Sequence, residues 1–392
     1  MNLKQIKEEV ISRSKQLENT IIQNRRHFHM YPETAFEEEQ TALFIEKKLA
    51  AMGYSTQRAA GTGIIARLKD IKPGKTTALR ADMDALNINE ENTFPYKSLN
   101  TGKMHACGHD AHMASLLGAA QILYDLKEHL PGNIKLIFQP AEEGQAGAKK
   151  IVAEGHMRDV DAVFGLHVWT YLPSGMIASR KGAFWAGADK FKISITGQGG
   201  HAAAPHKSID PTAVLVDIYN AIQKIISREL DPFCPAVIST PQFKASHAHN
   251  IIPEKAVLEG SFRTMDSETR LHILCRISDI VEGYSRAWRC EGMLEADPDN
   301  YPPVHNDPDV YDRADSLLSG LGGITEASPY MVSEDFSFYL EKAPGALILL
   351  GMQDEEKGII HPHHHPQFDI DESKLWKAAA LYAQLGFYFM DL

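Results

Sequence analysis

The residues best suited to chemistry fall into five short polar clusters, and each is expected at or near the end of a strand. The clusters occupy residues 80–86, 105–110, 139–143, 165–167 and 361–366. Polar side chains that follow strands gather at one edge of an α/β sheet, where such folds build their sites. Together the clusters supply aspartate, cysteine, glutamate and histidine, which are ligands of divalent transition metals in proteins.

Glu142 and Glu143 are adjacent and follow an apolar run. Because adjacent side chains diverge, one carboxylate can bind a metal while the other faces the water that the metal activates. The pair therefore predicts a metal-dependent hydrolytic site. The opposing interpretation is a histidine-rich surface without chemistry, since the chain holds 18 histidines.

Cys107 lies between His105 and His109, and two roles compete for it. As a nucleophile it would need one of these histidines as a base. As a metal ligand it would act together with His109, and we favour this role. The other three cysteines have no histidine beside them, and we expect Cys275 to lie in a hydrophobic core.

The elements that position these clusters alternate between helices and strands. Apolar spacing predicts helices within the first fifty residues, including one at 38–52 that ends at Gly53. Further helices are expected at 114–126, 146–153 and 373–385, and short buried strands at 63–68, 76–81, 134–138, 162–166 and 345–350. This order is typical of an α/β fold whose sheet has helices on both faces.

Between residues 187 and 297 the pattern changes to that of an α+β domain. Residues 191–196 alternate strictly between apolar and polar, as in a half-exposed antiparallel strand. Helices are then expected at 211–228 and 267–287, and strands at 237–243, 256–262 and 293–296. This order predicts an antiparallel sheet with two helices on one face. We therefore expect a catalytic domain built from residues 1–186 and 298–392, interrupted by an inserted domain at 187–297.

The composition excludes several classes of protein. With 40 Lys and Arg against 51 Asp and Glu, the 392-residue chain has a formal net charge of −11, which disfavours nucleic acid and anionic membranes as partners. Hydrophobic residues make up 44% and charged residues 23%, as in a globular protein with a full core. Four cysteines make no disulfide framework, the first residues are charged, and no apolar stretch is long enough to span a membrane. We expect a cytoplasmic protein.

Taken in order, the motifs around these residues resemble those of the M20 metallopeptidase and amidohydrolase family. The matching segments are Asp82-Met83-Asp84-Ala85-Leu86, His105-Ala106-Cys107-Gly108-His109-Asp110, Gln139-Pro140-Ala141-Glu142-Glu143, Gly165-Leu166-His167 and Gly199-Gly200-His201. The chain is similar to the branch that contains aminoacylases, hippurate hydrolases, auxin-conjugate hydrolases and carboxypeptidases. The resemblance implies a metallopeptidase-type α/β catalytic domain, with a mixed sheet and flanking helices, and an inserted α+β dimerisation or lid domain.

Carried over to this chain, the resemblance implies a site for two divalent metal ions in each subunit. The implied ligands are Cys107, His109, Glu143, His167 and His364, and His363 and His365 compete for the last position. Glu142 matches the general base, and Asp84 matches the aspartate that orients the site. Asp82 stands where other branches have a metal-binding histidine, and its role stays open. Thiolate and imidazole ligands favour zinc, while manganese, cobalt or nickel also suit such mixed sites.

The inserted domain is implied to complete the site. His201 matches a histidine that reaches the active site of the partner subunit, so the resemblance implies a homodimer or a dimer-based homotetramer. Asn250 and Arg263 match residues that hold the substrate carboxylate, for which a guanidinium is a suitable partner. We expect residues 191–196 to form an exposed edge strand that pairs with its copy in the second subunit.

The function that these features favour is hydrolysis of the amide bond of N-acyl-L-amino acids, which releases a carboxylic acid and a free amino acid. The nearest alternative is a metallocarboxypeptidase that releases C-terminal amino acids from short peptides. Two alternatives from other classes are a metal-storage protein and thiol redox chemistry at Cys107. Glu142 argues against storage, because storage needs ligands but no base.

Overall fold

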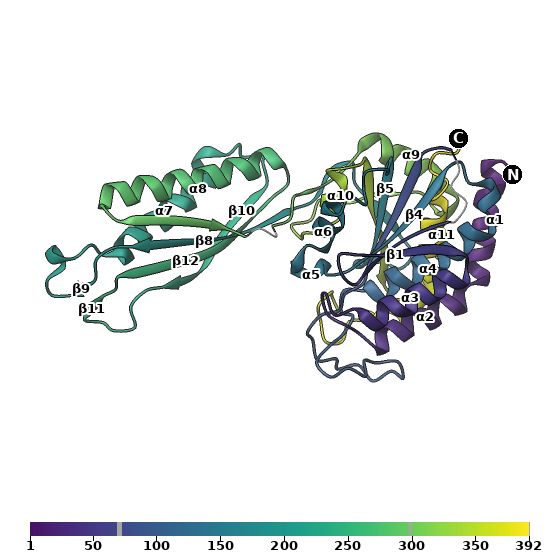
Figure 1. Ribbon diagram of the computed structural model, residues 1–392, viewed down its shortest axis with the longest axis horizontal. Coiled ribbons are helices and arrows are strands. Elements are labelled where there is room, and N and C mark those ends of the chain that lie inside the picture. The colour runs from purple at the N-terminus through teal and green to yellow at the C-terminus, as the bar shows by residue number, and fades with distance from the viewer. Residues whose placement is uncertain (69–72, 298–299, 392) are drawn as a thin grey trace. The chain divides into compact units, whose positions relative to one another are not determined.

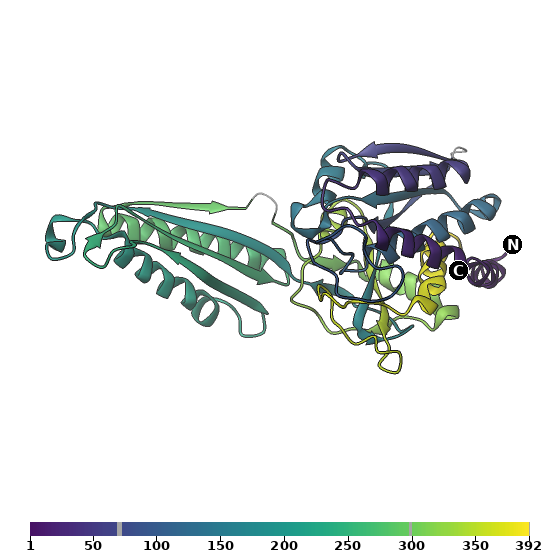
Figure 2. The same ribbon diagram turned by 90° about the horizontal axis from the view of Figure 1, so that it is seen from below.

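The computed structural model describes residues 1–68, 73–297 and 300–391, which form two compact units (Figures 1 and 2). The first unit consists of Met1–Gly182, His305–Ser328 and Asp335–Leu392, and the second of Ala183–Val304 and Pro329–Glu334. The second unit thus begins and ends a few residues outside the expected bounds of 187 and 297. It also includes Pro329–Glu334, a segment that we expected in the catalytic domain.

A mixed eight-stranded sheet runs through the described part of the first unit, in the order β1-β2-β4-β3-β5-β16-β6-β15. The strands are β1 (Tyr54–Ala59), β2 (Gly63–Leu68), β3 (Thr76–Asp82), β4 (Asn133–Gln139), β5 (Ala162–Pro173), β6 (Ile177–Ser179), β15 (Thr325–Glu326) and β16 (Gly345–Gln353). The central strands β4, β3, β5 and β16 are parallel to one another. They are almost entirely buried, which explains why apolar residues predominate in β16 and in parts of the other three strands.

Helices surround this sheet, and α4 (His109–Asp125) is the most deeply buried of those that carry site residues. It packs against α2 (Glu18–Met30) and α11 (Leu375–Leu385). The other helices of the unit are α1 (Leu3–Gln16), α3 (Glu39–Ala51), α5 (Glu142–Gln145), α6 (Gly147–Ala153), α9 (Pro308–Leu318) and α10 (Ser337–Leu340).

Two elements of the first unit differ from the prediction in a way that matters for the site. The helix expected at 114–126 begins at His109, and its first turn contains the buried polar residues His109, Asp110 and His112. The strand expected at 162–166 continues to Pro173, so His167 lies within β5. Both extensions include buried polar residues, among them His109, His112 and His167, whose burial depends on tertiary contacts that an apolar pattern cannot reveal.

The second unit contains a four-stranded antiparallel sheet in the order β10-β12-β8-β13. Its strands are β8 (Gly187–Thr196), β10 (Ala236–Lys244), β12 (Lys255–Thr264) and β13 (Glu291–Ala296). Two amphipathic helices, α7 (Pro211–Glu229) and α8 (Ser267–Trp288), lie side by side on one face of this sheet (Figures 1 and 2). Their isoleucines pack against Ile193, Leu258 and Phe262 in one core.

Two expectations for the second unit were wrong. The strand at 191–196 belongs to β8, which is paired on both sides by β12 and β13 and is not an edge strand. Strict alternation marks a sheet with one open face, and it does not distinguish a central strand from an edge. Cys275 is exposed on α8 and not in the core. It lies two residues from both buried Ile273 and buried Ile277, which places it on the opposite side of the helix.

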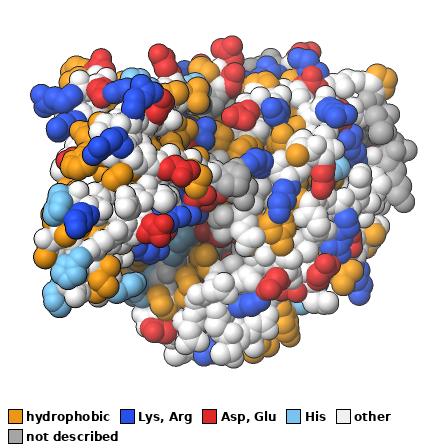
Figure 3. Space-filling model, turned by 60° about the vertical axis from the view of Figure 1, so that its left-hand side comes forward, with side chains coloured by type: hydrophobic (Ala, Val, Ile, Leu, Met, Phe, Trp, Pro, Cys, Tyr) orange, Lys and Arg blue, Asp and Glu red, His pale blue; other side chains and the backbone are white. Residues whose placement is uncertain are grey.

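No helix within the described ranges is long and apolar enough to cross a membrane. On the face seen in Figure 3, basic and acidic side chains are interspersed, with apolar side chains between them. That face carries no extended patch of a single charge, of the kind that binds nucleic acid through its phosphates.

Candidate metal centre

The structure brings the predicted metal ligands together in the first unit. Ligand atoms of Cys107, His109 and His167 lie within 4.8 Å of one another, as do those of Cys107, Glu143 and His364. A third group of the same size joins His109 to Glu142 and Glu143. Because the three groups share members, the five predicted ligands and the predicted base form one continuous cluster.

Residues with positive φ angles lie at or beside the predicted ligands and orient the chain there. Gly108 has a φ of +91° and directly precedes α4, and a Cβ on it would lie 2.3 Å from Val168 Cγ2, so only glycine fits between the helix and β5. Ala141, with a φ of +56°, turns the chain after β4 and points the next two carboxylates toward the cluster. His364, with a φ of +65°, brings the histidine loop to Glu143.

The three histidines predicted as ligands all present Nε2 to the cluster. His109 donates its Nδ1 proton to the carbonyl oxygen of Asp84 at 2.8 Å, and His167 donates its own to Val168 at 2.6 Å. The buried Nε2 of His109 has no hydrogen-bond partner in the part of the chain that the structure describes. Nε2 of His167 lies 3.6 Å from the Cys107 sulfur, and Nε2 of His364 lies 3.1 Å from Glu143 Oε1. Each of these Nε2 atoms is placed where its lone pair could coordinate a divalent metal ion once the nitrogen is free of its proton.

The surroundings of Cys107 favour a ligand over a nucleophile. Burial, together with the nearby carboxylates of Glu143 and Glu142, raises the pKa of the thiol. A nucleophile needs the opposite shift, whereas a bound cation would deprotonate the thiol outright. His105, the other base considered, makes no hydrogen bond to Cys107; burial lowers its pKa to about 3, and neither ring nitrogen has a partner among the described residues.

Asp84 aligns the predicted base and the predicted ligands. One carboxylate oxygen accepts the backbone N–H of Glu142 and the other that of Glu143, both at 2.9 Å. The carbonyl oxygen of Asp84 also accepts the proton of His109. One buried residue therefore fixes the turn that carries both glutamates and the tautomer of a histidine ligand.

Of the three consecutive histidines, His364 is the one that approaches the cluster. His363 is stacked on Trp169 with ring centroids 4.7 Å apart, and its Nε2 accepts the N–H of Thr170 at 3.2 Å. His365 is stacked on His361 at 4.3 Å, and its Nδ1 accepts the N–H of Gln367. Both rings are thus engaged elsewhere, which favours His364 as the last ligand.

Glu38 supports the site but follows from no motif in the sequence. Its buried carboxylate accepts the N–H of Ala141 at 3.0 Å and the hydroxyl of Thr62 at 2.5 Å. Burial raises the pKa of Glu38 to about 7. The contact joins positions 103 residues apart, and only the folded structure reveals that Glu38 holds the turn before Glu142.

The remaining predicted residues lie in the second unit, at two separate places. His201 and Asn250 are neighbours at one end, where β9 (Gly200–His201) pairs with β11 (Ile251–Ile252) and Ala202 donates to the carbonyl of Asn250 at 3.1 Å. Arg263 lies eight residues along β12 from Lys255, the strand residue at that end. At about 3.3 Å per residue, the part of β12 from Lys255 to Arg263 spans about 26 Å, so Arg263 lies far from the end that carries Asn250.

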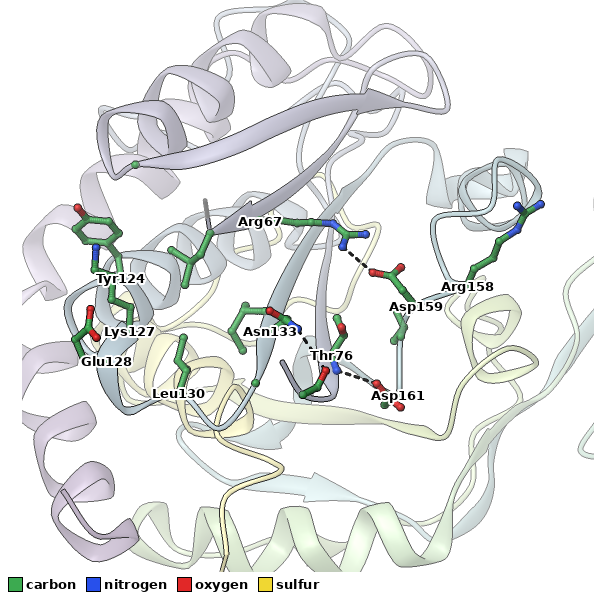
Figure 4. A pocket seen from close by; sticks show the side chains of 16 residues that line it. Arg67, Thr76, Tyr124, Lys127, Glu128, Leu130, Asn133, Arg158, Asp159 and Asp161 are labelled. Atoms are coloured by element: carbon green, nitrogen blue, oxygen red, sulfur yellow. Dashed lines mark hydrogen bonds and ion pairs between the residues drawn. The ribbon is translucent and has the colours of Figure 1, made fainter. Parts of the chain in front are cut away.

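A separate cavity of about 680 Å³ opens in the first unit (Figure 4). Thr76, Asn133 and Asp161 line it, at the amino ends of β3, β4 and β5. Glu143 follows the carboxyl end of β4, and His167 lies in β5 beyond its amino end. The cavity therefore lies at the opposite edge of the sheet from the candidate metal centre and is not part of it.

Comparison with known proteins shows which family the chain is similar to. Residues 78–386 match the model of peptidase family M20/M25/M40. The chain belongs to this family. The match confirms the resemblance and the fold class inferred from the motifs, and it makes the protein a hydrolase.

Curated relatives match this M20 chain along almost its whole length. It is 40% identical over 381 residues to thermostable carboxypeptidase 1 of Saccharolobus solfataricus. The aligned residues cover 96% of this chain and 97% of that protein. It is 38% identical over 386 residues to IAA-amino acid hydrolase ILR1-like 2 of Arabidopsis thaliana (97% and 87% covered). It is also 38% identical over 367 residues to N-acetyl-L-cysteine deacetylase of Bacillus subtilis (93% and 86% covered).

A solved structure of the M20 family supports the interpretation of the cluster as a metal centre. A Bacillus subtilis protein described as a dinuclear metal binding peptidase matches with a TM-score of 0.83 and 32% identity, covering 96% of this chain and 99% of that one. The donors of this chain, one thiol, three imidazoles and neighbouring carboxylates, are of the type that such centres use.

Proposed function

We propose that the protein hydrolyses the amide bond of N-acyl-L-amino acids at a dinuclear metal centre formed by Cys107, His109, Glu143, His167 and His364. The observation that carries the proposal is the position of Glu142. Its carboxylate lies beside the ligand atoms of His109 and Glu143, and Asp84 fixes its backbone. A storage site would need the ligands but not a base held in this way.

The names of the relatives support the substrate class. An IAA-amino acid hydrolase and an N-acetyl-L-cysteine deacetylase both act on an amino acid that carries an acyl group on its nitrogen. A carboxypeptidase cuts the amide bond on the same side of an amino acid with a free carboxylate. Release of C-terminal amino acids from short peptides is therefore the second candidate function.

Different residues of this chain would perform separate steps of amide hydrolysis. When bound, a pair of divalent ions acidifies a water molecule and polarises the scissile carbonyl group. Glu142 accepts the proton of the attacking water and passes it to the leaving nitrogen. His201 accepts the N–H of Ala203 at Nδ1, which leaves the proton of a neutral ring on Nε2, where it can be donated to the oxyanion. We propose zinc as the metal, with manganese, cobalt or nickel as alternatives.

We propose a homodimer, alone or as half of a homotetramer, because one chain cannot bring Asn250 and Arg263 to the same carboxylate. If both residues hold one substrate carboxylate, as the resemblance implies, the length of β12 supports a contribution of one of them from a second chain. The edge strand β10 offers exposed apolar side chains for pairing, while Pro241 and a bulge after Ser239 interrupt its ladder. Val237 and Phe243 on it are 45% and 41% exposed, and Phe233 just before it is 92% exposed. The exposed side chains of β13 include the charged Glu291 and Glu295, which discourage edge pairing.

A cytoplasmic location is also a proposal. All four cysteines are free in the structure, and Cys275 is exposed. Free thiols persist in a reducing compartment.

Replacing Arg263 with alanine is expected to raise KM strongly for N-acetyl amino acids and to leave the fold intact. Nη1 of Arg263 is buried and has no hydrogen-bond partner within the described ranges. A guanidinium with a free donor can bind the carboxylate of a substrate. Steady-state kinetics on N-acetyl amino acids, their C-terminal amides and dipeptides test this prediction and the substrate class together. If wild-type enzyme cleaves the amides as well as the free acids, the proposed substrate class is wrong. Faster cleavage of dipeptides than of N-acetyl amino acids would favour the carboxypeptidase.

A further inference from the structure

His112 is a further histidine beside the predicted ligands, and no motif assigns it a role. His112 is fully buried on α4, and its ring centroid lies 5.5 Å from that of His109 and 4.7 Å from that of His167. With Asp82 and His109 it also offers ligand atoms within 4.8 Å of one another. His112 is therefore either a further ligand or a support for the others.

The hydrogen bonds of His112 exclude it as a ligand. The backbone N–H of Val168 donates to Nε2 at 2.9 Å, so that nitrogen carries no proton. The proton of the neutral ring then lies on Nδ1, which donates to Asp82 Oδ1 at 2.6 Å. Neither ring nitrogen retains a lone pair for a metal.

Both carboxylate oxygens of Asp82 also accept hydrogen bonds from buried side chains. While Oδ1 accepts the proton of His112, Oδ2 accepts Nη1 of Arg80 at 2.7 Å. All three side chains are fully buried, so the guanidinium balances the charge of the carboxylate where no water reaches it. Asp82 therefore anchors His112 through Oδ1 while Oδ2 is bound to Arg80.

This chain of hydrogen bonds ends at a proposed metal ligand. Val168 donates its N–H to His112, and its carbonyl oxygen accepts Nδ1 of His167 at 2.6 Å. That second bond turns Nε2 of His167 toward Cys107. We propose that Asp82 and His112 are positioning residues that hold the backbone of Val168 and thereby fix the ring orientation of His167. The inference rests on the metal centre proposed above.

Nuclear magnetic resonance of the wild-type protein tests the assignment without any substitution in the site. Histidine labelled with nitrogen-15 is combined with cadmium-113, a metal that thiolate and imidazole ligands bind. We expect coupling to cadmium at Nε2 of His109 and His167, and a His112 ring that carries its proton on Nδ1 and shows no coupling. Coupling at His112, or a proton on its Nε2, would overturn the positioning role and leave the metal centre standing. Absence of coupling at every histidine would remove the metal centre, and the positioning role with it.

Variants then measure what the positioning contributes. His112→Gln and Asp82→Asn are each expected to weaken cadmium binding by about 10–100-fold, the usual effect of removing a group that orients a ligand. Because both act through one chain of bonds, the double variant should bind no more weakly than the worse single variant. Ser115→Ala, on the same buried face of α4, is the control and should keep wild-type affinity. Competition with a chelator gives the dissociation constants, and thermal unfolding of the metal-free proteins shows that each is folded. Unchanged affinity in folded His112→Gln would contradict the proposal.

Discussion

Glutamine in place of Glu142 is expected to lower kcat by about two to four orders of magnitude, the typical weight of general acid–base catalysis. The amide keeps the shape of the side chain but cannot accept a proton from water. The backbone of Glu142 stays bound to Asp84, so the five ligands should keep their places. Turnover of an N-acetyl amino acid and the metal content per chain are the two measurements.

Glu143→Gln is the matched control for this experiment. Glu143 is adjacent on the same turn, and its backbone N–H is held by the same aspartate. Since we propose Glu143 as a ligand, its variant should lose metal as well as activity, whereas Glu142→Gln should lose activity alone. If Glu142→Gln turns over at the wild-type rate, the base lies elsewhere and Glu143 is the first alternative.

Replacing His201 with alanine is expected to lower kcat by about 10²–10³-fold, the usual cost of removing one donor to the oxyanion. Metal content should not change, because His201 lies in the second unit and the proposed ligands lie in the first. His247→Ala removes another exposed histidine of the second unit, close in sequence to Asn250, and serves as the control. It should keep wild-type kcat.

Mixing the two inactive variants tests whether His201 acts on the partner subunit. A hybrid dimer of Glu142→Gln and His201→Ala chains contains one site with both residues intact and one site with neither. Random exchange at equal ratio makes about half of the dimers hybrid, so activity should recover to about a quarter of wild type. No recovery after verified subunit exchange would show that His201 acts within its own chain or has no catalytic role.

Much of the fold follows from local pattern because its strands and helices are regular. Strand β2 and the apolar parts of β3, β4 and β16 lie at the predicted positions, since buried strands are recognisable as short apolar runs. The pattern fails where polar residues enter the core. His109 and His112 open α4 although no apolar periodicity marks them, because their partners are Asp84, Asp82 and Val168.

The residues of the candidate site likewise fall into those that local sequence motifs reveal and those that only tertiary contacts reveal. Residues with characteristic neighbours, such as Cys107 and Glu142, could be proposed from motifs. Glu38 could not, because its contact with Ala141 depends on packing between distant segments. The place of Arg263 relative to Asn250 also requires the strand register, which the sequence does not specify.

Titration of metal-depleted protein with zinc tests the central claim most directly, with turnover of an N-acetyl-L-amino acid and bound zinc per chain recorded at each step. The donor set predicts no turnover without metal, and activity that rises with bound zinc and reaches its maximum at two ions per chain. Full turnover by protein that elemental analysis shows to be free of metal would contradict it.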